Sequence, residues 1–226
     1  MKFIKIILIL TILLGIIFYL DGQNIFKIRK IDLESDKITC AGNEEIKNES
    51  GVLGQQFFFL KQNLIKEKLR KKFICIKDVD LNYKFPNKLD LKITERKPAL
   101  VVSMSFIVDE EGFVFARKDE EINIPKVEIV GFDIKMGAVF PDNIIKKSLS
   151  VFNFLSKISL NVRDAKISQE RELIIISDMK IIFNLYDDIE SKLASLQLIL
   201  NQAKIESRVL KYVDLRFDKP VITYER

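Results

Sequence analysis

The pattern of residues 80–99, DLNYKFPNKLDLKITERKPA, constrains the fold of this chain more than any other stretch. Apolar and polar residues alternate on both sides of the Phe-Pro-Asn triplet at 85–87. A period of two on each side of a turn predicts two antiparallel strands with one buried face. Pro86 fixes its own φ and Asn87 tolerates turn geometry, so the chain reversal has a local cause. Residues 80–99 therefore predict a β-hairpin.

The region around this hairpin, residues 24–96, predicts a small α+β domain. A first strand is expected over 24–33 and a short helix over 44–50, followed by a second helix over 61–72 and then by the hairpin. In this order three strands and two helices on one face can bury a single core.

Two features inside this region bear on function. The three phenylalanines of the stretch 57–60, FFFL, are interpreted as core residues rather than as a binding patch. In the helix 61–72, Leu64, Ile65 and Leu69 form an apolar face, and lysines and arginines occupy the other. That basic face fits either a solvated surface or contact with acidic lipid headgroups.

The N-terminus carries an apolar run at 6–20, interrupted by Thr11 and Gly15. With the two apolar residues that follow Lys2, the run is just long enough to cross a bilayer. No small-residue cleavage site follows it, so a retained signal anchor is favoured over a cleaved signal peptide. We expect residues 1–23 to form a cytoplasmic tip and a transmembrane helix, with the remainder outside the cytoplasm.

The remaining residues predict a β-rich domain with two packed helices. One helix begins at Pro141, and the other begins after Asp187 with a stripe of apolar residues every three or four positions, which we expect to pack on a sheet. Strands are expected over residues 100–103, 106–108, 113–116, 126–130, 161–168, 172–177, 180–185, 209–217 and 221–224.

Three motifs share one resemblance: the hairpin with its exit ERKPA at 95–99, the turn VDEEGFVF at 108–115, and VDLRF at 213–217. Together they resemble the FtsQ/DivIB family of bacterial cell-division proteins. The hairpin is similar to the end of that family's POTRA domain, the turn resembles the start of its second domain, and VDLRF resembles a second signature. The resemblance implies a POTRA domain at 24–97 and an FtsQ-type β domain at 98–226.

The residue types present exclude several kinds of chemistry. The chain has no histidine, which removes the commonest general base and the commonest zinc ligand. No Gly-x-Ser-x-Gly elbow and no phosphate-binding glycine loop occur, so we expect neither catalysis nor a cofactor. The net charge is +5, but the 37 basic residues are mixed with 32 acidic ones along the chain and do not form a single basic tail. This pattern disfavours nucleic acid as a partner. Cys40 and Cys75 are either joined by one disulfide or are two unrelated cysteines that act as small apolar side chains.

Binding by a sheet edge is the remaining function. A terminal strand over 220–224 offers free N–H and C=O groups to an incoming strand. The resemblance implies that the last strands capture an FtsB-like protein, which itself pairs with an FtsL-like protein. The positions implied are Arg216, Phe217, Val221, Ile222 and Tyr224, of which at least half also belong to the sheet core.

The function expected from the resemblance is a non-enzymatic scaffold in the bacterial cytoplasmic membrane. It would link early and late division proteins at the septum, including the septal wall synthases. Two alternatives are a POTRA-bearing component of a secretion or envelope-assembly system and an anchored enzyme of unknown type.

Overall fold

The computed structural model describes residues 6, 7, 9–12, 15, 25–34, 40–103, 105–117 and 122–225. In this part of the chain no helix combines the length and the apolar character that crossing a membrane requires. The expected transmembrane segment, 6–20, lies largely outside the described residues. The membrane anchor therefore stays a prediction.

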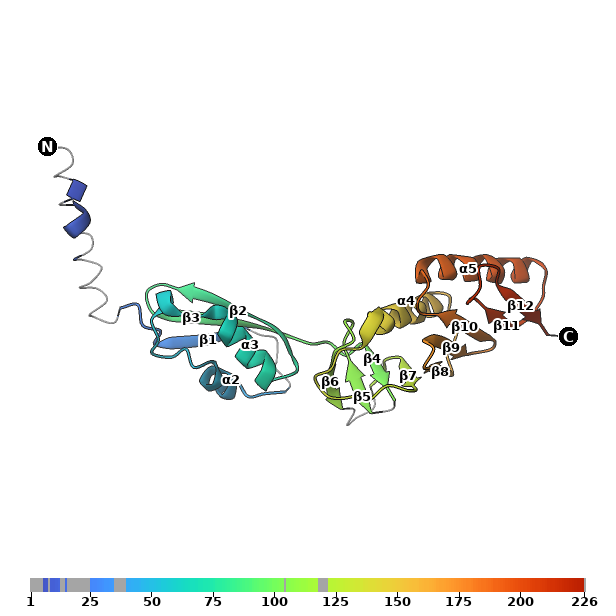
Figure 1. Cartoon of the computed structure of the whole chain (residues 1–226), viewed down its shortest axis with the longest axis horizontal. Helices are drawn as coiled ribbons and strands as arrows, with labels where there is room; N and C mark the ends of the chain where they lie inside the picture. The colour runs from blue at the N-terminus through green and yellow to red at the C-terminus, as the bar shows by residue number, and fades with distance from the viewer. Residues whose placement is uncertain are drawn as a thin grey trace. The chain divides into compact units, whose positions relative to one another are not determined.

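The chain divides into two compact units, Met1–Arg96 and Lys97–Arg226. In the first unit a three-stranded sheet has the order β1-β3-β2, with β1 parallel and β2 antiparallel to β3. The predicted order of strand, helix, helix, strand, strand is confirmed. The elements are β1 (Lys30–Glu34), α2 (Asn43–Ser50), the short 3-10 helix η1 (Phe57–Phe59), α3 (Gln62–Lys72), β2 (Ile76–Lys84) and β3 (Lys88–Glu95) (Figure 1).

The core of the first unit lies between one face of this sheet and the two helices. Leu89, Leu91 and Ile93 of β3 are buried, as are Ile65 and Leu69 of α3. Because successive strand residues point to opposite faces, the alternation in the sequence directs these three β3 side chains to the same side. The predicted hairpin and its buried face are confirmed.

Two expectations about buried side chains in this unit are wrong. Phe58 and Phe59 were expected in the core, and both are exposed. Leu64 of α3 is exposed as well, although Ile65 beside it is buried. A one-turn 3-10 helix turns only part of its surface toward the core, so three consecutive aromatic residues cannot all be covered.

The first strand is also shorter than expected, because it begins at Lys30. Before it, Lys27 forms an isolated bridge with Gln56, and the N–H of Ile28 donates to the carbonyl of Gln55 at 3.0 Å. This part of the chain therefore pairs with the segment that precedes η1.

The second unit contains a nine-stranded mixed sheet with the order β12-β11-β10-β9-β8-β7-β4-β5-β6. Each strand expected from the sequence is present, within a few residues of its predicted ends. The strands are β4 (Leu100–Val102), β5 (Phe106–Val108), β6 (Val114–Arg117), β7 (Lys126–Ile129), β8 (Asp164–Ile167), β9 (Glu172–Ile176), β10 (Lys180–Asn184), β11 (Leu210–Asp214) and β12 (Val221–Tyr224).

Two helices pack on one face of this sheet (Figure 1). α4 (Ile144–Lys157) follows a 3-10 turn, η2 (Pro141–Asn143), and α5 (Ile189–Ile205) lies between β10 and β11. The predicted stripe of α5 meets the core, which confirms that this helix packs on the sheet. The stripe consists of Ile189, Leu193, Leu196 and Ala203, which are buried, and Leu200, which is partly buried.

Candidate partner-binding edge

The last strand, β12, forms one edge of the nine-stranded sheet. Among the described residues its only strand partner is β11, which it meets in antiparallel register with Val221 opposite Asp214 and Tyr224 opposite Leu210. The N–H of Glu225 donates to the carbonyl of Val209 at 2.8 Å, so Glu225 faces β11. Since the direction of backbone groups alternates along a strand, the N–H and C=O groups of Ile222 and Tyr224 point away from the sheet.

The side chains of β12 divide between the two faces of the sheet. Ile222 and Tyr224 pack against the core, and the guanidinium carbon of Arg208 lies 3.5 Å from the centroid of the Tyr224 ring. Val221 and Thr223 are exposed on the other face. Of the five candidate positions these two pack against the core, which is fewer than the half that was expected.

Arg216 lies in an ion-pair network just after β11. Its Nε donates to Asp214 Oδ1 at 2.9 Å and its Nη2 to Asp214 Oδ2 at 2.5 Å. Its Nη1 donates to Glu172 Oε1 of β9 at 2.6 Å, and the Tyr212 hydroxyl donates to Asp214 Oδ2 at 2.8 Å. The Arg216 side chain thus links the end of β11 to β9, two strands away in the sheet.

The network shifts the protonation equilibria of its members. Hydrogen bonds from Arg216 hold the pKa of the buried Asp214 carboxyl below its ordinary value. The hydrogen bonds to Asp214 and Glu172 raise the pKa of Arg216. Burial, with the neighbouring Asp214 carboxylate, raises the pKa of Tyr212. Each shift favours the charge state that the network requires, so the Arg216 side chain has a structural role.

Phe217 is the candidate residue with the most exposed side chain, at 53%. Its carbonyl accepts a hydrogen bond from Lys192 Nζ of α5 at 2.9 Å, which fastens the β11–β12 turn to that helix. A pocket of about 300 Å³ lies between this turn and the start of α5, lined by Asp187, Asp188, Ser191, Lys192, Ser195, Phe217, Asp218 and Pro220. Its lining includes Pro220, the residue just before β12.

The structure therefore separates the five candidate positions into three groups. Phe217 and Val221 present side chains to solvent, Ile222 and Tyr224 present backbone groups at the edge, and Arg216 supports the turn. The sequence missed Lys192 and Glu172. Asp214 could have been found, because it stands inside the VDLRF motif two residues before Arg216.

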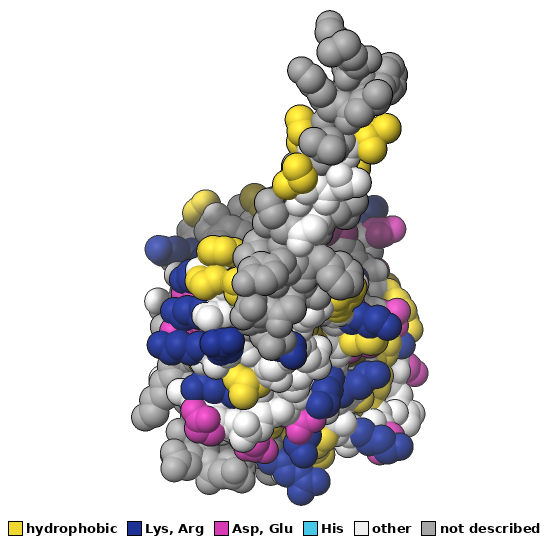
Figure 2. Space-filling view, turned by 90° about the vertical axis from the view of Figure 1, so that its left-hand side faces the viewer, with side chains coloured by type: hydrophobic (Ala, Val, Ile, Leu, Met, Phe, Trp, Pro, Cys, Tyr) yellow, Lys and Arg dark blue, Asp and Glu magenta, His cyan; other side chains and the backbone are white. Residues whose placement is uncertain are grey.

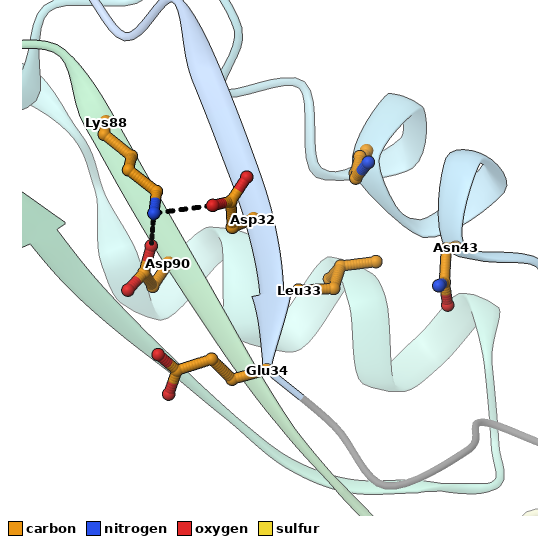
Figure 3. A pocket seen from close by; sticks show the side chains of 7 residues that line it. Asp32, Leu33, Glu34, Asn43, Lys88 and Asp90 are labelled. Atoms are coloured by element: carbon orange, nitrogen blue, oxygen red, sulfur yellow. Dashed lines mark ion pairs between the residues drawn. The ribbon is translucent and has the colours of Figure 1, made fainter.

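A second group of charged residues lies on the open face of the first unit's sheet. Lys88 Nζ lies 2.5 Å from Asp32 Oδ2 and 3.5 Å from Asp90 Oδ1 (Figure 3), and Lys84 also pairs with Asp90. Lys88 lowers the pKa of Asp32, and Lys84 lowers that of Asp90. The lysines keep both carboxylates ionised. A carboxylate held in this state can form ion pairs that join β1 to β3, but it is a poor donor of a proton.

Cys40 and Cys75 are joined by a disulfide, with 6.4 Å between their Cα atoms. This decides between the two readings that the sequence left open. A Glu95 carboxylate oxygen lies close to both sulfurs, in an arrangement that could hold a metal ion. A sulfur in a disulfide is not a thiolate, however, and so these two cysteines cannot act as metal ligands while the bond is intact.

Comparison with known families decides the membership of the chain. The family model "POTRA domain, FtsQ-type" matches residues 26–96, and the model "Cell division protein FtsQ/DivIB, C-terminal" matches residues 100–216. The chain belongs to the FtsQ/DivIB family. It combines a POTRA domain with a β-rich C-terminal domain, in a mixed α/β chain. The second match ends at Arg216, so β12 lies beyond it.

Three relatives carry names from the same family. Cell division protein DivIB of Clostridium acetobutylicum is 25% identical over 203 residues, which cover 85% of this chain and 80% of the relative. DivIB of Clostridium botulinum is 26% identical over 67% of the chain and 64% of that protein. Cell division protein FtsQ of Streptomyces coelicolor is 29% identical over 45% of the chain and 39% of its own length.

Proposed function

We propose that this chain is a non-enzymatic scaffold of the cell-division machinery that captures a partner by adding a strand to β12. The observation that carries the proposal is the position of β12 at the sheet edge, with β11 as its only strand partner among the described residues. An incoming strand can hydrogen-bond to the outward backbone groups of Ile222 and Tyr224. Phe217 and Val221 then supply side-chain contacts that select the partner.

Family membership supports a partner from the division machinery. An FtsB-like protein paired with an FtsL-like protein would occupy the edge, and septal wall synthases would be recruited with them. Residues 1–23 would anchor the scaffold in the bacterial cytoplasmic membrane, with the N-terminus in the cytoplasm and both domains outside. The family match over residues 100–216 supports this role over the alternative of a secretion or envelope-assembly component.

Co-purification of the full-length chain with the FtsB-like and FtsL-like proteins of the same organism tests the proposal. We expect Ile222→Pro to abolish capture, because it removes an outward N–H while the residues that face β11 keep their bonds. Ile222→Ala is the matched control, since it keeps the N–H and should retain capture. Phe217→Glu should weaken capture through the side-chain contact.

Equal capture by wild type and Ile222→Pro would contradict strand addition. Loss of capture by Phe217→Glu alone would instead indicate a partner held by side chains at the β11–β12 turn. Circular dichroism of each variant checks that the sheet is intact, so that a folding defect is not taken for a binding defect.

A further inference from the structure

Five phenylalanines gather at the end of the first unit where β1 begins. Three segments meet there: the N–H of Phe57 donates to the carbonyl of Phe26 at 3.2 Å, and the N–H of Arg29 donates to the carbonyl of Asn87 at 2.8 Å. The ring centroid of Phe26 lies 5.4 Å from that of Phe58 and 6.2 Å from that of Phe85. We call this group the aromatic cap: Phe26, Phe57, Phe58, Phe59 and Phe85.

The cap is attached to the hairpin on one side and open to solvent. Phe57 stacks on Tyr83 with 4.0 Å between ring centroids, and the Tyr83 hydroxyl bonds to the carbonyl of Pro86, so one side of the cap is fixed to the hairpin. Phe58, Phe59 and Phe85 are 69%, 76% and 73% exposed. A contiguous exposed apolar patch of this kind marks a surface that another phase or molecule covers.

The charged residues of the segments that build the cap are all basic. The three segments that build it, 25–31, 51–66 and 83–89, contain no aspartate or glutamate. Four of their basic residues form ion pairs with acids elsewhere in the unit: Lys30, Lys66, Lys84 and Lys88. The other three, Lys27, Arg29 and Lys61, stand within three residues of a cap phenylalanine. Figure 2 shows hydrophobic side chains beside lysine and arginine side chains on the face it presents.

The short segment between the apolar run and the cap limits the distance between them. The apolar run ends at Leu20, six residues before Phe26. Six residues span at most about 22 Å even when fully extended. If the run crosses the membrane, as the proposed function requires, Phe26 of the cap cannot lie farther than this from the residue at which the run ends.

We propose that the aromatic cap inserts into the headgroup region of a bilayer that contains anionic lipid, beside the chain's own membrane anchor. Phenylalanine side chains next to lysine and arginine are the composition of interfacial membrane-binding surfaces. The basic residues gain from the negative surface potential of anionic lipid. Insertion holds the first domain at the membrane and limits how it can turn about its anchor.

The chain contains no tryptophan, so a single introduced tryptophan reports on its own position. Full-length Phe58→Trp is reconstituted into phosphatidylglycerol vesicles with and without brominated acyl chains. We expect its emission to lie at shorter wavelength than in detergent and to be quenched by the brominated lipid. Lys72→Trp is the matched control, because Lys72 is exposed at the other end of α3, and its emission should be neither shifted nor quenched.

Flotation of the same vesicles separates the two proposals. If the chain does not float with the vesicles, the anchor and the cap assignment both fail. If it floats but Phe58→Trp behaves like Lys72→Trp, the anchor holds and the cap assignment is wrong. A shift to shorter wavelength without quenching would mean that protein covers the cap, which also overturns the lipid assignment. Weaker quenching in pure phosphatidylcholine, or after Lys27→Glu with Lys61→Glu, would support the role of the basic residues.

Discussion

At the scale of single residues, we expect Asp214 to make the stability of the second unit depend on pH. Its folded-state pKa lies below the ordinary value of 3.8, because Arg216 hydrogen-bonds to the ionised form. The stabilisation from this pair is complete above pH 3.8 and is lost as the pH falls through the lower folded-state pKa. We expect the free energy of unfolding to fall in this acid range, and Asp214→Asn to reduce that fall. Urea unfolding at a series of pH values measures it.

Asp178→Asn is the control for this prediction. Asp178 pairs with Arg163 at 2.5 Å, but both side chains are exposed, so the pair contributes less than about 1 kcal/mol. An acid response of Asp214→Asn identical to that of the Asp178→Asn chain would show that the Arg216 network does not couple protonation to stability.

Arg216 and the two exposed phenylalanines of η1 show what the sequence could not reveal. Arg216 was found through the VDLRF motif, yet its contact with Glu172 spans 44 positions and depends on the order of β9, β10 and β11. Phe58 and Phe59 were placed in the core on hydrophobicity alone. The hydrophobicity of a residue shows that its burial would be favourable. Whether a ring is buried also depends on how much core surface lies beside the single 3-10 turn that carries it.

At the scale of elements, periodicity located the helices and strands, because each buries one face. Periodicity did not reveal the order of the strands in the sheet. For example, β7 pairs in parallel with both β4 and β8, which are separated from it in the sequence by segments that no local pattern bridges. The edge position of β12 is likewise a result of the ladder order. A strand that comes late in the sequence can be inserted between two earlier strands, so its place in the sequence does not put it at an edge.

The α5 stripe permits a test of element packing. Leu196 is fully buried against the sheet, whereas Leu198, two residues later on the same helix, is exposed. We expect Leu196→Ala to lower the free energy of unfolding by about 2 to 5 kcal/mol, through lost contact and a residual cavity. Leu198→Ala should change it by less than about 0.5 kcal/mol. Equal effects in urea unfolding would mean that α5 does not rest on the sheet through this stripe.

At the scale of the whole molecule, the chain contains two separate cores, and both cysteines belong to the first. The disulfide closes a loop between positions 35 residues apart. In the chain-entropy model, a cross-link that closes a loop of this length raises the free energy of the unfolded chain by about 4 kcal/mol. A stabilisation of this size is a large share of what a small three-stranded domain can have.

Reduction should therefore act on one unit only. We expect dithiothreitol to lower the thermal transition of the first unit and to leave that of the second unit unchanged, because the core of the second does not include either sulfur. Differential scanning calorimetry of the full chain, with and without reductant, resolves the two transitions, and Cys40→Ser with Cys75→Ser should reproduce the reduced trace without reductant. If reduction moves both transitions together, the two cores unfold as one cooperative unit.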